Sequence, residues 1–260
     1  WCVTIENVLR TMTQMESYSQ MGGDISVGMG CLYAVGDIHG RNDLLLKIIN
    51  LIAQDIGTCG KAEHARVVFL GDYIDRGDES RAVIHTLRHC QQETGLKCCF
   101  LLGNHEEAML DFLTDPIKGR AWLDYGAAQT LASYGVRPPV RDLDETGLID
   151  LRDRLQLAMG SDLEFFKSLQ PYFISGSVIC THAGLAPDDI GKWKNTQAMV
   201  WGHGDSLCDT PAPGYLLVHG HYDAATPVLC PGRVCVDTGA YYSGKLSAVC
   251  IHNDLKIIST

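Results

Sequence analysis

The chain has 260 residues, of which 46% are hydrophobic and 20% charged, as in an ordinary soluble globular protein that can bury a large core. Its formal net charge is −10, from 31 acidic and 21 basic side chains, which argues against a stable nucleic-acid complex. No run approaches the roughly 18 apolar residues of a membrane span, so no membrane partner is expected.

The cysteines indicate a reducing environment. The chain contains 11 of them, several inside apolar runs, such as Cys98, Cys180 and Cys250. Cysteines in such positions are typical of small buried hydrophobes, so we expect a cytoplasmic protein without a disulfide framework. No Cys-x-x-Cys pair occurs, which argues against a structural zinc ribbon.

Residues 1–30 are interpreted as an N-terminal appendage to a single domain over 31–260. The apolar pattern predicts a short amphipathic helix over 3–20. Met21–Ser26 fits the N-myristoylation pattern only if translation began at Met21, and the preferred interpretation is a glycine-rich connector.

The next segment predicts two successive βαβ units. Three apolar runs are the expected strands, at Cys31–Val35, Val67–Leu70 and Cys98–Leu102. Helices are predicted between them, over Asp43–Asp55, with Gly57 as its stop, and over Glu79–Cys90. Such units place the strands in parallel with right-handed crossovers.

Residues 106–170 read as a helical insertion that covers the sheet edge. The helical periodicity is broken at Asp115–Pro116 and at 137–139, and Ser161–Glu164 predicts a capping box that opens a helix to about Leu169. We expect this insertion to set substrate specificity.

Four further strands follow the insertion, and the last two are expected to be antiparallel. They are the apolar runs Ser177–Cys180, Tyr215–Val218, Val234–Val236 and Leu246–Ile251.

Five of the predicted strands are each followed by potential metal ligands. Asp37, His39, Asp72, Asn104 and His105 come just after the first three strands. The carboxyl ends of strands in an open α/β sheet are where ligands bind, and oxygen donors with imidazoles suit first-row divalent metals. The pattern therefore predicts a metal-dependent phosphate-ester hydrolase.

The motifs GDIHG, GDYIDRG, GNHE, HAG and GH, in this order, resemble the calcineurin-like metallophosphoesterases, specifically the phosphoprotein phosphatase family. The resemblance covers roughly residues 31–251. The stretches 122–135 and 236–246 look most like its compact bacterial-type members, which share ancestry with the symmetrical diadenosine tetraphosphatases. It implies an α/β fold: a β-sandwich of mixed sheets flanked by helices, with the helical insertion.

The resemblance also implies two bound divalent metal ions, Mn²⁺ first, with Fe or Zn²⁺ as alternatives. The first ion would bind Asp37 and His39, Asp72 would bridge both, and the second would bind Asn104, His182 and His221. A metal-bridging hydroxide would attack phosphorus, and two ions can neutralise the phosphoryl oxygens.

Three catalytic roles follow from the same resemblance. His105 would be the general acid, oriented by a hydrogen bond that it donates to Asp75, and Arg76 would bind phosphate oxygens as a planar fork. His221, rather than His219, matches the ligand, which leaves His219 to orient a ligand or to meet the substrate.

Further substrate contacts are expected from Asn104, from His203 and from Tyr242. His203 occupies the slot where related bacterial-type members carry a second phosphate-binding arginine, and the alternative is an ordinary loop residue. Tyr242 falls where the family places a tyrosine beside the active site, and the alternative is a wall or core aromatic.

Asp75 decides the expected substrate. Dedicated diadenosine tetraphosphatases tend to lack this aspartate, whereas protein phosphatases keep it, which favours phosphoserine or phosphothreonine in proteins. A diadenosine tetraphosphatase or related dinucleoside polyphosphate hydrolase is the alternative, and a catalytically silent metal-binding scaffold is a third reading. The expected partner is thus a phosphoprotein or a nucleotide, and the oligomeric state stays open.

Overall fold

The computed structural model describes residues 27, 30–59, 64–93, 96–185, 190–203, 214–252 and 254–260. The helix predicted over 3–20 and the segment Met21–Ser26 lie outside these residues.

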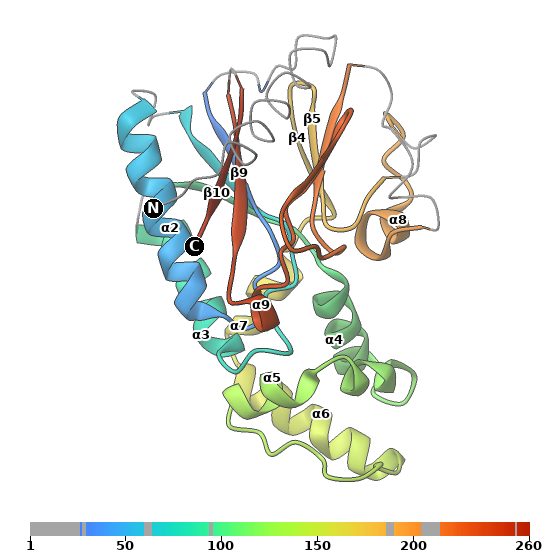
Figure 1. The fold of residues 1–260 in the computed structure, drawn as a ribbon. Coiled ribbons are helices and arrows are strands. Elements are labelled where there is room, and N and C mark those ends of the chain that lie inside the picture. Colours follow the sequence, from blue (N-terminus) through green and yellow to red (C-terminus); the bar gives the residue numbers. More distant parts are fainter. Residues whose placement is uncertain are drawn as a thin grey trace.

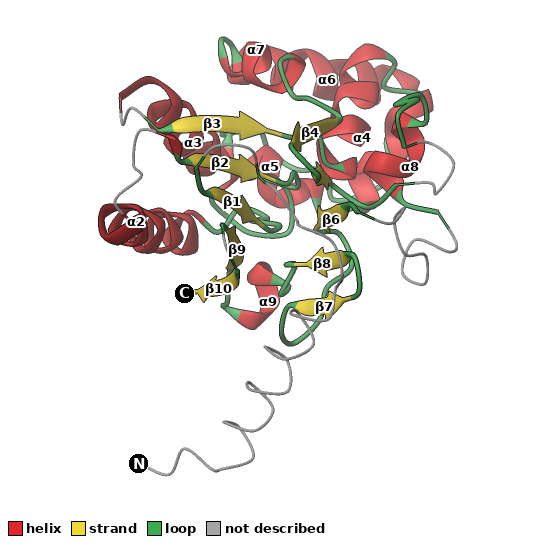
Figure 2. Ribbon diagram, turned by 90° about the horizontal axis from the view of Figure 1, so that it is seen from above, coloured by secondary structure: helices red, strands yellow, loops and turns green. Residues whose placement is uncertain are grey.

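Two five-stranded sheets pack face to face as a sandwich flanked by helices (Figure 2), so the predicted fold class is confirmed. The first sheet has the order β10-β9-β1-β2-β3 and the second the order β4-β5-β6-β8-β7. In the first sheet the bounds are β1 (Leu32–Val35), β2 (Arg66–Phe69), β3 (Lys97–Phe100), β9 (Ser247–Ile251) and β10 (Leu255–Ser259). In the second they are β4 (Tyr172–Ser175), β5 (Val178–Thr181), β6 (Leu216–His219), β7 (Val228–Cys230) and β8 (Arg233–Cys235).

Strand β1 shows how the alternation of side chains builds two cores. Ala34 points toward the second sheet and joins the apolar layer between the sheets, with Val178 and Val218. Tyr33 and Val35 point the other way, into the core shared with the helices. All of these side chains are buried, so the central strand contributes on both faces.

The strand pairing confirms the two predicted βαβ units, because β1 pairs in parallel with β2 and β2 with β3. Strand β9 pairs antiparallel with β1, as expected. The expectation for β8 is wrong in part: it is antiparallel to β7 but parallel to β6. The short strands β4, β7 and β10 were not predicted, because each lies at a sheet edge and buries only part of its residues.

Helices α2 (Asn42–Cys59) and α3 (Ser80–Glu93) cover the outer face of the first sheet (Figure 1). The predicted stop at Gly57 is wrong, since α2 continues through this residue to Cys59. Glycine inside a helix costs about 1 kcal/mol relative to alanine, which packing of the helix can offset.

The predicted helical middle section is found as α4 (Asn104–Thr114), the 3-10 helix η2 (Lys118–Asp124), α5 (Ala127–Ser133), α6 (Glu145–Met159) and α7 (Asp162–Lys167). These helices lie together at one end of the sandwich (Figure 1). Two short helices complete the described fold, α8 (Thr196–Trp201) and α9 (Ala240–Ser243).

The capping box predicted at Ser161–Glu164 does not form. Ser161 has helical backbone angles, φ −69° and ψ −12°, and its side chain makes no cap hydrogen bond. Asp162 instead accepts hydrogen bonds from Arg88 and from the Tyr134 hydroxyl, so the acidic residue ties α7 to α3 and to the end of α5.

The described cysteine side chains, eight in number, are all free thiols. Among the described helices, none combines the length and apolar character needed to cross a membrane.

Leu155 tests whether α6 belongs to the same cooperative core as the sheet. Its side chain is fully buried with the first-sheet and α4 residues, whereas Leu157 on the same helix is 85% exposed. We expect Leu155→Ala to lower the free energy of unfolding by about 2–5 kcal/mol, because it leaves a cavity.

The matched variant Leu157→Ala should change that free energy by less than about 0.5 kcal/mol. Urea unfolding followed by circular dichroism measures both. Equal effects of the two variants, or a separate unfolding transition for the helices, would contradict a shared core.

Candidate active site

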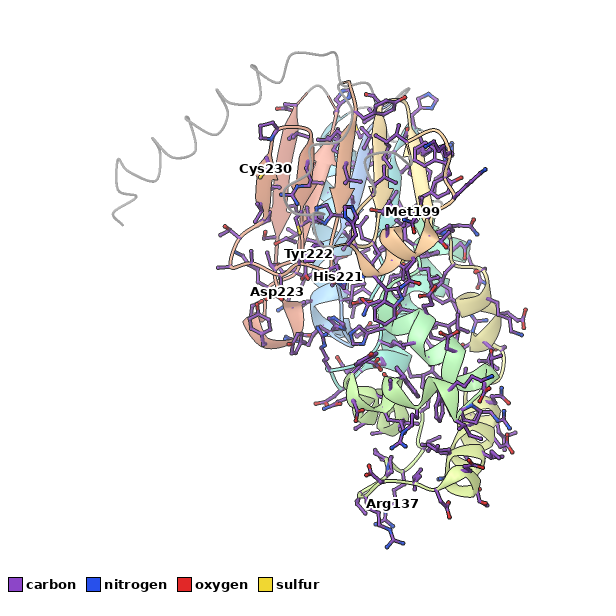
Figure 3. All side chains as sticks on the ribbon, turned by 90° about the vertical axis from the view of Figure 1, so that its right-hand side faces the viewer. Arg137, Met199, His221, Tyr222, Asp223 and Cys230 are labelled. Atoms are coloured by element: carbon purple, nitrogen blue, oxygen red, sulfur yellow. The ribbon has the colours of Figure 1, made fainter. Side chains whose placement is uncertain are left out.

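The predicted site residues converge at the end of the sandwich that faces helix α4. His221 and its neighbour Tyr222 lie at this end of the strands, as Figure 3 shows. Asp37, His39, Asp72, His105 and His182 are all buried there, each with no more than 2% of its surface exposed.

The backbone at this site is strained. Among the described residues, six that are not glycine have a positive φ, and five of them are predicted site residues: His39, Asp72, Asp75, Arg76 and His221. The left-handed region costs such residues of order 1–3 kcal/mol each and is found where the surrounding structure enforces it. The positive φ values therefore lie in the loops whose side chains converge on the site.

Two glycines allow the loops to approach one another. A Cβ on Gly103 would lie 2.2 Å from Asp72 Oδ1, and a Cβ on Gly220 would lie 2.0 Å from Asp37 Oδ1. Glycine at both positions is thus required by the carboxylates that pack against it.

One group of ligand atoms forms around His182. Its Nε2 lies 2.9 Å from Asn104 Oδ1, 3.2 Å from His221 Nδ1 and 3.5 Å from Asp72 Oδ1. His182 Nδ1 lies 2.9 Å from the Leu70 carbonyl, which can only accept, so Nδ1 carries the proton and Nε2 presents a lone pair. A lone pair that faces the Asn104 oxygen, with His221 and Asp72 atoms close to the same point, suits a shared cation, so this group fits a metal ion.

A second group contains His39, Asp72 and His105. His39 Nε2 lies 3.4 Å from Asp72 Oδ2, and its Nδ1 donates to the Ile74 carbonyl at 2.8 Å. This backbone contact fixes the ring and its tautomer, as is usual for metal-binding histidines. The structure also brings His105 into this group of possible ligand atoms.

Asp37, in the loop after β1, contacts the loop after β6. Its Oδ2 accepts a hydrogen bond from the His221 backbone at 3.0 Å, while its Oδ1 is buried without a hydrogen-bond partner. A buried carboxylate oxygen is costly unless it is paired, so Oδ1 is available to a cation. Burial, with Asp237 and Asp72 nearby, raises the pKa of Asp37 well above its usual value.

The electrostatics of the site also fit bound cations. Burial alone would raise the pKa of Asp72, but the imidazoles of His182, His105 and His39 outweigh it and lower that pKa. Burial lowers the pKa of His39 to about 3 and that of His221 to about 4, so both imidazoles are neutral and able to bind a metal. Buried carboxylates beside neutral imidazoles form a donor set for divalent metals.

Asp75 holds His105 in place. His105 Nδ1 donates to Asp75 Oδ2 at 2.7 Å, and Trp122 Nε1 donates to the same oxygen at 2.9 Å. Thr130 Oγ1 donates to the other oxygen at 2.5 Å. Burial by itself would lower the pKa of His105, but Asp72 and the bond to Asp75 outweigh it, so that pKa is raised.

Glu106 is a site residue that the sequence analysis did not single out, although it ends the GNHE motif. Its Oε2 accepts from the backbone N–H groups of Asp72 (2.8 Å) and Gly103 (3.1 Å). Its Oε1 accepts from those of Tyr73 (2.8 Å) and Ile74 (3.2 Å). One buried carboxyl group therefore shapes two ligand-bearing loops.

The remaining predicted residues lie at the rim of the site. Arg76 Nη1 donates to His39 Nε2 at 3.0 Å, and its guanidinium lies 5.0 Å from the ring centre of Tyr241. His203 Nε2 lies 3.4 Å from the Leu185 carbonyl. Tyr241, not Tyr242, contacts His39, with ring centres 5.5 Å apart.

Tyr242 points away from this contact, because its hydroxyl donates to Asp223. The sequence could not choose between two adjacent tyrosines, since the register of α9 decides which ring faces His39.

His219 lies beside the ligand group but contacts none of the predicted ligands through a hydrogen bond. Its Nδ1 is bonded to the Gly220 carbonyl at 2.9 Å, and its Nε2 is buried without a partner among the described residues.

Glu106 should be needed for stability as well as for the site. In Glu106→Gln one oxygen is replaced by an NH₂ group that faces backbone N–H donors. We expect a loss of about 1–3 kcal/mol in the free energy of unfolding, as for buried groups left unsatisfied. Chemical denaturation measures it.

Asp111→Asn is the matched control, because Asp111 is exposed on the same helix. If Glu106→Gln is as stable as this control, Glu106 does not hold the loops.

Comparison with known proteins agrees with this architecture. The family model described as calcineurin-like phosphoesterase matches residues 32–226. The curated relatives include the bis(5'-nucleosyl)-tetraphosphatase PrpE [asymmetrical] of Halalkalibacterium halodurans, 25% identical over 232 residues, covering 83% of this chain and 87% of the relative. The protein of the same name from Bacillus subtilis is 22% identical over 232 residues, covering 82% and 87%.

Two solved structures show the same fold. A putative diadenosine tetraphosphatase superposes with a TM-score of 0.61 at 18% identity, covering 89% of this chain and 93% of the other. A cold-active protein-tyrosine phosphatase of a psychrophilic Shewanella species superposes with a TM-score of 0.60 at 15% identity, covering 92% and 84%. The family match over most of the chain decides the assignment: this protein belongs to the calcineurin-like phosphoesterases and is a hydrolase of that family.

Proposed function

We propose that this enzyme hydrolyses the phosphoric anhydride of dinucleoside polyphosphates at a site for two divalent metal ions. The observation that carries the proposal is the similarity to bis(5'-nucleosyl)-tetraphosphatases along most of both chains. It supports the alternative of the sequence analysis over its leading reading, a protein phosphatase.

The proposed ligands divide into two sets that share Asp72. Asp37 and His39 would hold one ion, and Asn104, His182 and His221 would hold the other. When bound, the ions activate the attacking water and neutralise the phosphoryl oxygens. Mn²⁺ is our first choice of metal, and Zn²⁺ is an alternative. The support for Zn²⁺ is a zinc-dependent endopolyphosphatase of Saccharomyces cerevisiae, which is 27% identical over 176 residues, covering 61% of this chain and 48% of that protein.

Three residues act on the substrate or position a group that does. Arg76, exposed at the rim, binds phosphate oxygens with its planar fork. His105 donates a proton from Nε2 to the oxygen that leaves phosphorus, since its Nδ1 is held by Asp75. The raised pKa of His105 favours its protonated form, which a general acid requires.

A phosphoprotein substrate remains the second candidate because of the 2.7 Å bond between His105 and Asp75. An acid held in this way suits poor leaving groups such as the alkoxide of serine or threonine. His203 and Tyr242 stay proposed substrate contacts in either case.

The substrate test compares kcat/KM for diadenosine tetraphosphate, a phosphoserine peptide and an aryl phosphate, using protein reconstituted in turn with Mn²⁺, Zn²⁺ and Fe²⁺. We expect at least a tenfold preference for the dinucleotide, loss of all activity with chelator, and recovery on adding metal. A preference for the phosphopeptide would support the second candidate instead.

The acid role predicts an effect that depends on the leaving group. His105→Asn should lower kcat by roughly 10²- to 10⁴-fold for an alkyl phosphate and by less for a leaving group that departs as a stable anion. Steady-state kinetics on a matched alkyl and nitrophenyl pair give the ratio. Equal losses on both substrates would show that His105 is not the acid.

A further inference from the structure

One aromatic side chain lies next to the proposed acid His105, and a second lies against the first. The Tyr125 ring lies 6.0 Å from the ring of His105 and 6.2 Å from that of Trp201, at steep angles to both. We propose that Tyr125 and Trp201 form the wall against which a nucleobase of the substrate stacks. This inference rests on the proposed function and names the part of the site that recognises the nucleoside.

The position of Tyr125 is fixed by the catalytic loops. Its backbone N–H donates to the Trp122 carbonyl at 3.0 Å, and the Trp122 indole is bonded to Asp75. The next residue, Gly126, accepts from the Arg76 backbone at 3.1 Å, and a Cβ there would lie 2.9 Å from Arg76. These bonds fix the backbone that carries Tyr125 relative to Arg76 and Asp75 before any substrate binds.

The backbone of Tyr125 is fixed by hydrogen bonds, while its ring is partly exposed to solvent. Tyr125 is 37% exposed, and none of the described residues forms a hydrogen bond with its hydroxyl. A large aromatic side chain that is both anchored and open to solvent is typical of a binding contact, because ordering it costs little on binding.

Trp201 supports the ring from the α8 side. Its indole N–H donates to the Glu107 carboxylate, which lies on α4 one residue beyond Glu106. The wall thus joins α8 to the helix that begins with Asn104 and His105. A base that stacks on this wall lies beside the atom to which His105 delivers its proton.

Tyr241, another exposed aromatic at the rim, is already engaged. Tyr241 packs against His39 and lies under the Arg76 guanidinium, so its face serves the phosphate-binding arginine. Tyr125 has no comparable cation on its ring among the described residues, which leaves the ring free for a neutral aromatic base.

The test compares two ligands that differ only in the base. AMP and ribose 5-phosphate are titrated by calorimetry into the metal-reconstituted wild type and into Tyr125→Leu and Tyr125→Phe. Base–aromatic stacking predicts that AMP binds roughly 5- to 150-fold more tightly than ribose 5-phosphate. Tyr125→Leu should remove this difference, and Tyr125→Phe should keep it.

Tyr215→Leu is the control, because Tyr215 is also 37% exposed but precedes β6 at the end of the strand opposite His219. It should bind AMP as the wild type does. Trp201→Phe gives a second readout and serves if Tyr125→Leu does not fold: the quenching of indole fluorescence that AMP causes should be lost.

The outcomes separate this inference from the proposed function. Equal binding of AMP and ribose 5-phosphate by the wild type, or an equal loss of both ligands in Tyr125→Leu, overturns the stacking wall. A wild type that shows no preference for diadenosine tetraphosphate in the substrate panel overturns the proposed function, whatever the binding of AMP.

Discussion

The site depends on the buried carboxyl group of Glu106. Four backbone N–H groups point at it, three from the loop after β2 and one from the loop before α4. Burial and the neighbouring Asp72 raise the pKa of Glu106 to about 8. However, the carboxyl group faces four hydrogen-bond donors and no acceptor, and this environment suits an ionised carboxylate. By satisfying these groups, Glu106 allows Asp72 to keep its left-handed backbone and hold its side chain between both ligand groups.

Several buried acidic side chains lie close together around this site. Asp37, Asp72, Asp75, Glu106 and Asp237 are all at most 4% exposed. Asp75 is satisfied by His105, Trp122 and Thr130, whereas Asp37 keeps one oxygen without a partner. The protein thus separates a carboxylate whose oxygens are hydrogen-bonded to an imidazole, an indole and a hydroxyl from a carboxylate with one open oxygen. The proposed general acid and the proposed metal site require such a division, because they share one loop cluster.

The helical segment at the end of the sandwich contacts both Asp75 and His105. Trp122 and Thr130 bind Asp75, and Tyr125 between them faces His105. The segment that binds Asp75, and through it His105, therefore also carries the exposed ring of Tyr125, which we propose as a nucleobase contact. A change of sequence here would change this aromatic surface and leave the sheets and the proposed metal ligands as they are.

The sequence by itself determined the parallel strands β1 to β3, the helices between them and the ligand types, because apolar period and motif order are local properties. Edge strands β4, β7 and β10 each pair with an adjacent strand of a hairpin, but they bury only part of their residues and so carry a weak apolar pattern. The parallel pairing of β8 with β6 joins strands that β7 separates in the chain. Tertiary structure alone decided that Glu106 holds two loops, that Tyr241 and not Tyr242 meets His39, and that Tyr125 stands beside His105. Apart from the local bond between Glu106 and the Gly103 backbone, these contacts join residues at least 20 positions apart, so they are set by how the loops pack and a local pattern does not show them.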